Sequence, residues 1–224
     1  MLSYVKQYKV FFYILGALSA VILTIFYFIL KEDRILPVYH PADFNPVLLD
    51  SSIAHVKKHH KIADFSLTNQ NGRTITQDDY KDKIYVADFF FTTCATICPI
   101  MTDNMKIVQQ KIRFDKDIML LSHSVTPERD SVAQLKNYAL EKGVDSKKWN
   151  LVTGDKREIY KLARKSYCVA KTLGDGGPFD MIHTENFVLV DKEKRIRGTY
   201  DGTDKEEIEK LLEDIEVLKK EYEK

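Results

Sequence analysis

The hydrophobic residues of the 224-residue chain separate an apolar segment near the N-terminus from a longer region of mixed pattern. Residues 10–30 contain no charged side chain, and as an α-helix they would extend over about 31 Å, which matches the core of a bilayer. Strongly apolar residues continue after Ala17, Ser19 and Ala20, where a cleaved signal peptide would end. The pattern therefore favours an uncleaved transmembrane helix, with no cysteine nearby to accept a lipid.

Residues 31–56 follow this segment and contain Pro37, Pro41 and Pro46, half of the six prolines of the chain, without a sustained period. Such a stretch predicts an extended tether, and its apolar run LPVYHPADFNP indicates that it lies along the surface of a domain. We therefore divide the chain into a short N-terminus (1–9), a transmembrane anchor (10–30), a proline-containing tether (31–56) and a domain (57–224).

The domain begins with two clear strand signals. Asn71-Gly72 lies between two short strand-like runs in FSLTNQNGRTIT, which is typical of a β-hairpin. Residues 83–91, KIYVADFFF, form a nearly continuous apolar run of β-branched and aromatic residues. This pattern predicts a central strand that is buried on both faces.

Helices and strands alternate in the remainder of the domain. Apolar residues recur at helical spacing from Pro99 to about residue 113, and Thr126-Pro127-Glu128 has the composition of a helix start. The other elements that we expect are a strand over 118–125, a helix from Thr126 to about residue 140, a strand over 149–152, a helix over 156–166, a hairpin of 187–190 with 196–200, and an amphipathic helix over 204–222. This alternation predicts a single α/β domain.

Composition narrows the function classes. The chain has 34 Lys and Arg against 33 Asp and Glu, a net charge of +1, so its overall field does not attract nucleic acid, and we expect no nucleic-acid partner. Three cysteines are too few for a disulfide scaffold. Two of them lie four positions apart, so the chemistry is sought at that pair.

Cys94 and Cys98 lie in FFFTTCATICPIM, between the buried strand and the following helix. The amides and the dipole of a helix N-terminus favour a thiolate there. A spacer of three residues brings both sulfurs to one side, where they can form a disulfide or bind a soft metal ion. Buried cysteines often serve only as small apolar residues, but a strand-to-helix junction is where thioredoxin-like folds carry out their chemistry.

His183 is a candidate third ligand. It follows a glycine-rich stretch in GDGGPFDMIHTENFVLVD and directly precedes an apolar strand. A loop histidine at the end of a strand can reach a site on the neighbouring strand, and neutral imidazole binds copper well. The residues alone leave open the alternative of a hydrogen-bonded core histidine.

Residues 62–200 resemble the Sco family, membrane-tethered copper proteins that take part in assembling the dinuclear copper centre of cytochrome c oxidase. The resemblance rests on DFSLTNQNG, FFFTTCATICPIM, SVTPERD and IHTENFVLVD, in this order. It implies a thioredoxin-like fold and a copper site formed by Cys94, Cys98 and His183. It also implies a single-pass protein of a bacterial inner membrane, with residues 1–9 in the cytoplasm and the domain in the periplasm.

The chain departs from the family pattern at two positions near these ligands. Ala95 stands where members commonly have proline, which makes the loop less rigid, and Ile182 stands where many have an acidic residue before the histidine. Asp180 lies nearby but out of register. We expect these differences to affect copper affinity more than the ligand set.

Two thiolates and an imidazole satisfy Cu(I) and accept Cu(II) with an added weak ligand, whereas structural zinc normally takes four protein ligands. The expected function is a metallochaperone that passes copper to the copper-acceptor subunit of a respiratory oxidase, with metal binding gated by a Cys94–Cys98 disulfide. The alternative is an enzyme, a thiol-disulfide oxidoreductase that reduces the acceptor cysteines. A peroxidase-like protein on the same fold is less favoured, because no arginine for such chemistry stands out.

Other residues with chemical potential are more simply structural. We expect Cys168 to be a buried strand residue, and the lysine-flanked His55, His59 and His60 to lie in a solvated loop rather than to act as auxiliary copper ligands. The remaining residues of this kind are His123 in a core strand, His40 in the tether, the surface pairs Asp78-Asp79 and Glu206-Glu207, and the core side chains Phe89, Phe90, Phe91, Met101 and Met105.

Overall fold

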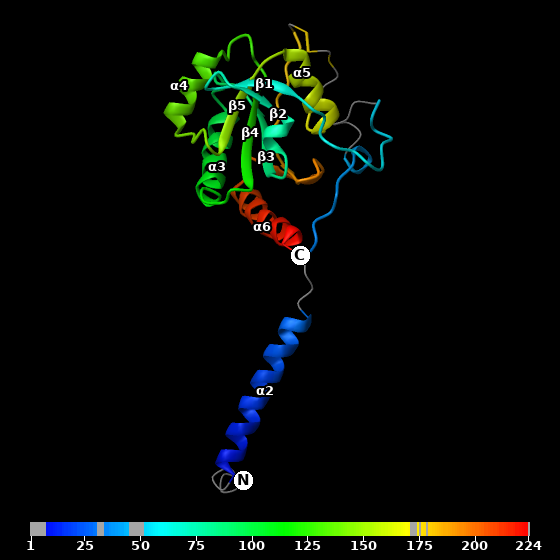
Figure 1. The fold of residues 1–224 in the computed structure, drawn as a ribbon, viewed down its shortest axis with the longest axis vertical. Coiled ribbons are helices and arrows are strands. Elements are labelled where there is room, and N and C mark those ends of the chain that lie inside the picture. The colour runs from blue at the N-terminus through cyan, green and yellow to red at the C-terminus, as the bar shows by residue number, and fades with distance from the viewer. Residues whose placement is uncertain are drawn as a thin grey trace. The chain divides into compact units, whose positions relative to one another are not determined.

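The computed structural model describes residues 8–30, 34–44, 52–170, 174, 176, 177 and 179–223. Contacts divide the chain into two compact units, Met1–Ile35 and Leu36–Lys224. Among the described residues, the first unit contains the helix α2 and the second contains the sheet (Figure 1).

The helix of the first unit, α2, runs over Lys9–Leu30 and confirms the helix predicted for residues 10–30. Among the described residues it is the one helix long and apolar enough to cross a membrane, over Lys9–Phe26. Its side chains from Lys9 to Phe26 are exposed. Length, composition and exposure are those of a membrane anchor.

The second unit is built on a seven-stranded mixed sheet in the order β2-β1-β5-β4-β3-β6-β7. The strands β3, β4 and β5 are parallel, and all other neighbours are antiparallel. The strand β3 is buried at every position, as its apolar run predicts. The strands are β1 (Ser66–Asn69), β2 (Thr74–Thr76), β3 (Ile84–Phe90), β4 (Ile118–Ser124), β5 (Trp149–Thr153), β6 (Asn186–Val190) and β7 (Ile196–Asp201).

Helices cover both faces of the sheet, and alternate residues of β3 belong to two separate cores. Ile84 and Val86 pack in the core that contains α3, α4 and α6, whereas Tyr85 and Ala87 pack in the core that contains α5 and the π-helix η4. The helices are α3 (Ile97–Lys111), α4 (Val132–Lys142), α5 (Lys156–Lys161), η4 (Leu162–Ser166) and α6 (Lys205–Tyr222), with short 3-10 helices η1 (Pro41–Asp43) and η3 (Gln77–Tyr80). The predicted α/β architecture is confirmed.

Residues 36–44, which the sequence places in the tether, pack on the second unit. Leu36 is buried, and its N–H donates to Glu221 Oε1 (2.7 Å). The buried guanidinium of Arg197 donates to the carbonyl of Leu36 (2.7 Å) and to that of Pro37 (3.1 Å). Farther along, Tyr39 pairs with Ile196. The chain therefore joins the domain at Leu36.

The predicted helix start at Thr126 is wrong. The helix α4 begins at Val132, and its cap is Ser131, whose hydroxyl accepts the N–H of Gln134 (3.2 Å). The preceding segment forms a turn in which the Thr126 hydroxyl donates to the buried Asp130 carboxylate (3.1 Å). Local capping residues were present at Thr126, but the tertiary contacts of Asp130 hold that segment in another conformation.

Candidate metal centre

The two cysteines lie in the connection from β3 to α3, at the carboxyl end of the three parallel strands (Figure 1). The N–H of Cys94 donates to the carbonyl of Phe91 (3.3 Å), which turns the chain back after the strand. Cys98 is the second residue of α3, and Pro99 lies in the first turn, where its missing N–H is tolerated. The predicted strand-to-helix junction is confirmed.

The two cysteine residues are in direct contact, and both thiols are free. The backbone N–H of Cys98 donates to Cys94 Sγ (3.4 Å), and the hydroxyl of Thr96 lies 3.6 Å from the same sulfur. Cys94 is half-buried, whereas Cys98 is buried against the core of α3. One sulfur is thus open to solvent and partners, and the other is held in the protein.

Because their surroundings differ, the two thiols have different pKa values. Burial raises the pKa of Cys94, but hydrogen bonds from Cys98 and Thr96 outweigh burial and lower that pKa to about 6. Burial raises the pKa of Cys98 to about 12, and the neighbouring Cys94 adds to the effect. At neutral pH the pair therefore consists of an accessible thiolate and a buried thiol.

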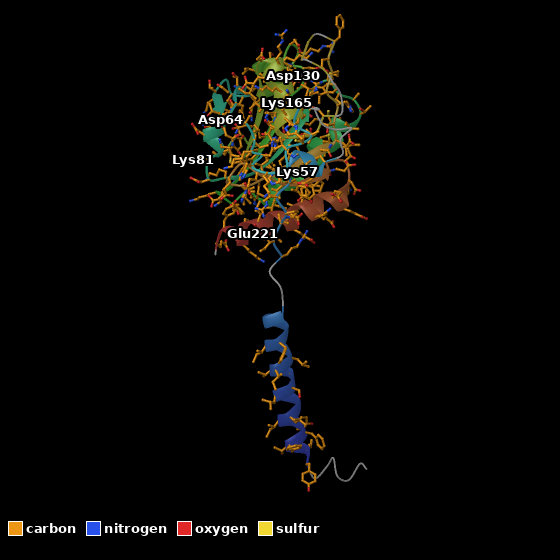
Figure 2. All side chains as sticks on the ribbon, turned by 90° about the vertical axis from the view of Figure 1, so that its right-hand side faces the viewer. Lys57, Asp64, Lys81, Asp130, Lys165 and Glu221 are labelled. Carbon is orange, nitrogen blue, oxygen red and sulfur yellow. The ribbon has the colours of Figure 1, made fainter. Side chains whose placement is uncertain are left out.

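A buried carboxylate that the sequence analysis did not single out forms hydrogen bonds with the start of the cysteine loop. Asp130 accepts hydrogen bonds from the N–H (3.2 Å) and the hydroxyl (2.6 Å) of Thr92, and from the hydroxyls of Ser124 (2.5 Å) and Thr126 (3.1 Å). Figure 2 shows Asp130 and Glu221 at opposite ends of the domain. The cysteine loop that Asp130 supports is therefore remote from the point at which Leu36 joins the fold.

A second carboxyl group that the sequence analysis missed lies in β3 itself. Asp88 is buried, and its Oδ1 atom has no hydrogen-bond partner among the described residues. Burial raises the pKa of Asp88 to about 7, although a hydrogen bond with Ser122 opposes the shift. The charge of Asp88 contributes to the raised pKa of Cys98. An aspartate inside the run KIYVADFFF was the available signal, because a charged residue rarely interrupts a buried strand.

His183 is exposed and lies in the segment that leads into β6. Its ring meets the ring of Phe91 edge-on, with centroids 6.3 Å apart. Among the described residues, no three Cys, His, Asp or Glu side chains are close enough to hold a metal ion. The structure brings the two cysteines together and places His183 against the loop residue Phe91, but it does not assemble all three, and the ligand set stays a prediction.

The donor types nevertheless suit a soft metal ion. An accessible thiolate beside a second thiol matches the preference of Cu(I) for sulfur. Within the described part of the chain no hydrogen bond occupies the imidazole of His183, so its nitrogens are available. Ile182 is buried in the core of α5, and Asp180 forms a two-pronged ion pair with Arg164 (2.7 and 2.8 Å). Neither residue offers His183 a carboxylate partner.

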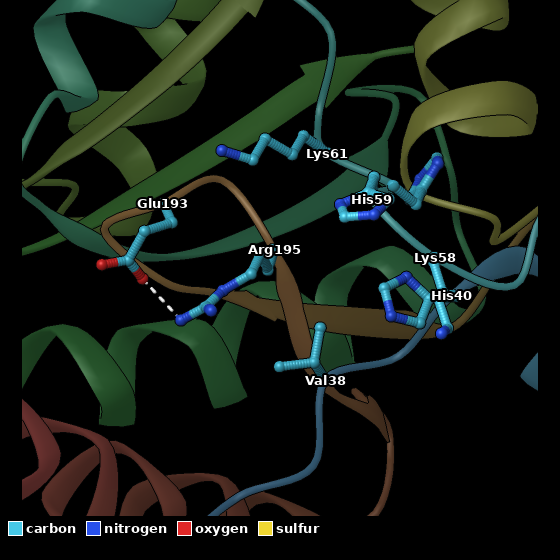
Figure 3. A pocket seen from close by; sticks show the side chains of 8 residues that line it. Val38, His40, Lys58, His59, Lys61, Glu193 and Arg195 are labelled. Atoms are coloured by element: carbon cyan, nitrogen blue, oxygen red, sulfur yellow. Dashed lines mark hydrogen bonds and ion pairs between the residues drawn. The ribbon is translucent and has the colours of Figure 1, made fainter.

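The histidines of the tether and the adjacent loop gather elsewhere. His40, His59 and His60 line a pocket of about 390 Å³ together with Lys58, Lys61 and Arg195 (Figure 3). His60 Nε2 lies 2.7 Å from the carbonyl oxygen of Ser166. His55 and His59 lie in irregular chain and not on one helical face, as expected of a loop.

The prediction that the third cysteine, Cys168, lies in a strand is wrong. Cys168 is buried, as expected, but it follows η4 and does not lie in a strand. Its φ of 57° lies in the left-handed region, which an extended strand does not use. His123 is the core strand residue that we expected, and burial lowers its pKa to about 4. The predicted core side chains Phe89, Phe90, Met101 and Met105 are buried, and Phe91 is partly buried.

The sequence profile of one protein family, described as SCO1/SenC, matches residues 54–220. The chain belongs to the SCO1/SenC family. The SCO1 protein homolog of Bacillus subtilis is 31% identical over 160 residues, which are 70% of this chain and 81% of that protein. The mitochondrial SCO1 homolog of Homo sapiens is 33% identical over 103 residues, 45% of this chain and 33% of that protein.

Solved structures of the SCO1/SenC family have the same fold. A SCO1/SenC family lipoprotein from Bacillus anthracis has a TM-score of 0.62 at 30% identity and covers 73% of this chain and 98% of its own. BsSco, described as a member of the Sco family of cytochrome c oxidase assembly proteins that has a disulfide switch, has a TM-score of 0.61 at 30% identity and covers 71% of this chain and 93% of its own. Copper-bound ScoI of Arabidopsis thaliana has a TM-score of 0.55 at 24% identity and covers 69% of this chain and 97% of its own, which shows a common fold. The predicted thioredoxin-like fold is confirmed.

Proposed function

We propose that this SCO1/SenC protein binds one copper ion through Cys94, Cys98 and His183 and passes it to the copper-acceptor subunit of a respiratory oxidase. The observation that carries the proposal is the contact between the Cys94 sulfur and the N–H of Cys98, which supports a thiolate beside a second sulfur at the end of the central strands. BsSco, described as a member of the Sco family of cytochrome c oxidase assembly proteins, points in the same direction at 30% identity.

Transfer of copper requires an open coordination site. Three protein ligands leave a position at which a cysteine of the acceptor can bind before the donor ligands leave. Cys94 is half-buried rather than buried, and His183 is exposed, so both can meet a partner. Binding copper requires the His183 segment to move toward the sulfurs, because the structure does not assemble the three side chains.

Oxidation of the thiols gates copper binding in this proposal. Formation of a Cys94–Cys98 disulfide removes two electrons and two protons, which a disulfide-bearing oxidant takes up, and it removes both sulfur ligands at once. The contact between the two residues supports a short path to this bond, and BsSco, at 30% identity, is described as having a disulfide switch.

The domain works, in this proposal, on the periplasmic side of a bacterial inner membrane, held by residues 10–30. The exposed apolar helix supports the anchor, and the relative from Bacillus anthracis is described as a lipoprotein. Periplasmic exposure agrees with the chemistry, because a disulfide gate needs an oxidising compartment.

A second candidate function is thiol-disulfide exchange with the acceptor. The pKa of about 6 for Cys94 and of about 12 for Cys98 is the division expected between an attacking thiolate and a buried thiol that resolves the mixed disulfide. In this alternative His183 has no essential part.

His183→Ala separates the two functions, because it removes a copper ligand and keeps both thiols. In one experiment the copper-loaded full chain in detergent micelles is mixed with the reduced acceptor domain, and the copper content of the acceptor is measured. In the other the metal-free full chain is mixed with the oxidised acceptor domain, and the disulfide content of the acceptor is measured. We expect His183→Ala to lose copper transfer, and Cys168→Ser, the matched thiol control, to retain it. Transfer that survives His183→Ala together with Cys94→Ser contradicts the proposal, and acceptor reduction at catalytic rates by both the wild type and His183→Ala favours the alternative.

A further inference from the structure

The segment before β6 presents a methionine on the same side as His183. Along residues 181–184 exposure alternates: Met181 is 41% exposed, Ile182 is 1% exposed, His183 is exposed and Thr184 is buried. In an extended chain residues two positions apart point to the same side. The thioether of Met181 and the imidazole of His183 therefore share the outer side of this segment.

This side of the segment borders the cysteine loop through Phe91. Met181 and Phe91 line one hollow of about 390 Å³. The ring of Phe91 meets the ring of His183, and the carbonyl of Phe91 accepts the N–H of Cys94. Phe91 thus contacts His183 and Cys94, and it shares a hollow with Met181.

The thioether of Met181 lies near the hydroxyl of Tyr160. The hydroxyl of Tyr160 lies 3.0 Å from the carbonyl oxygen of Val125, 3.1 Å from that of Asp180 and 3.9 Å from Met181 Sδ, and it accepts the N–H of Ile182. A hydroxyl carries a single proton, and two carbonyl oxygens are nearer to it than the sulfur is. The lone pairs of the thioether therefore stay available.

Among the four methionines that the structure describes, Met181 is also the exposed one, since Met101 and Met105 are fully buried and Met119 is partly buried. Burial is the usual state of a methionine that serves only packing. A thioether is a soft ligand that favours Cu(I) over Cu(II) and does not depend on pH for its binding form.

We propose that Met181 is a further ligand for Cu(I), which the His183 segment brings to the two cysteine sulfurs together with the imidazole. This inference rests on the proposed copper function and adds a ligand specific for the reduced ion. The ligand set for Cu(I) then contains three sulfurs and one nitrogen, and the thioether can be displaced first when a cysteine of the acceptor approaches, since it is uncharged.

Met181→Leu conserves volume at an exposed position and should leave the fold intact, and Met119→Leu is the matched control. The full chain in detergent micelles is titrated with Cu(I) against a chromogenic chelator, and separately with Cu(II). We expect Met181→Leu to raise the Kd for Cu(I) about tenfold, the lower end of what even outer-shell partners contribute, and to leave the Kd for Cu(II) unchanged. We expect Met119→Leu to change neither value.

A direct measurement uses protein labelled with selenomethionine and loaded with Cu(I). X-ray absorption at the selenium edge should show a copper neighbour at bonding distance in the wild type and none in Met181→Leu. An absent copper neighbour in the wild type, or an unchanged Kd for Cu(I) in Met181→Leu, overturns the inference. Either of these results leaves the proposed copper function standing if Cys94→Ser abolishes copper binding. Normal copper binding by Cys94→Ser overturns both the proposed function and the role of Met181.

Discussion

Replacement of Cys98 and Cys168 by serine leaves Cys94 as the one thiol of the chain, so that its ionisation can be followed alone. Of the groups that lower the pKa of Cys94, the backbone N–H groups of residues 96 and 98 and the hydroxyl of Thr96 survive the substitutions, whereas the thiol of Cys98 is replaced by a hydroxyl. With a pKa of about 6 instead of 9.0, the thiolate fraction at pH 7 is about 90% rather than about 1%.

The rate of alkylation changes less than this fraction. Intrinsic nucleophilicity falls with pKa with a Brønsted slope of about 0.4 to 0.5, so a fall of three pKa units lowers the reactivity of the thiolate about 20-fold. The two effects together leave the rate at pH 7 only about fivefold above that of an ordinary thiol. The midpoint of the pH profile is therefore the diagnostic quantity.

The assay is alkylation by iodoacetamide between pH 4.5 and 9.5, followed by mass spectrometry of the metal-free protein. We expect a half-maximal rate near pH 6 in the folded protein and a midpoint near the ordinary value in guanidinium chloride. Because the folded pKa is the lower one, the associated stability is present above the unfolded pKa and is lost as the pH falls through about 6. A folded midpoint near that of the unfolded chain would refute the reasoning.

Three further predictions concern the supports of the site and of the fold. Asp130→Ala leaves buried hydroxyls without an acceptor and should lower the free energy of unfolding by about 3 kcal/mol, measured by urea denaturation. The pKa of Asp88 is about 7 in the folded protein, above its unfolded value, so its contribution to the free energy of unfolding is present at low pH and is lost as the pH rises through 7. The free energy of unfolding of the wild type relative to Asp88→Asn should therefore fall by up to about 4 kcal/mol from pH 4 to pH 8. Arg197→Met should cost about 3 kcal/mol and make the chain near Leu36 sensitive to proteolysis, because it leaves Glu221 without its buried partner.

The sequence predicted the elements whose local pattern and tertiary role agree. The run that became β3 is apolar because both faces of this strand are buried, and Asn71-Gly72 forms the hairpin turn with Gly72 at a φ of 74°. The start of α4 could not be predicted in this way. Its position depends on Asp130, whose partner Thr92 lies 38 residues away and is brought near only by the parallel pairing of β3 with β4.

In the candidate site, too, the features set by local sequence could be predicted, whereas those set by tertiary contacts could not. The junction of Cys94 and Cys98 follows from local pattern, because the end of one strand and the start of one helix fix both residues. The raised pKa of Cys98 and the part of Asp88 depend on burial, which the sequence does not state for a single residue. The place of His183 beside Phe91 joins segments 92 residues apart in the sequence; its position before an apolar strand made it a candidate, and the family resemblance selected it over a core histidine.

The most direct test of the central claim is the stoichiometry of copper on the reduced full chain in detergent micelles, compared among single substitutions. We expect one tightly bound copper per chain in the wild type and in Cys168→Ser, and loss of that copper in Cys94→Ser, Cys98→Ser and His183→Ala. Tight binding of one copper that persists in all three of these variants would contradict the central claim.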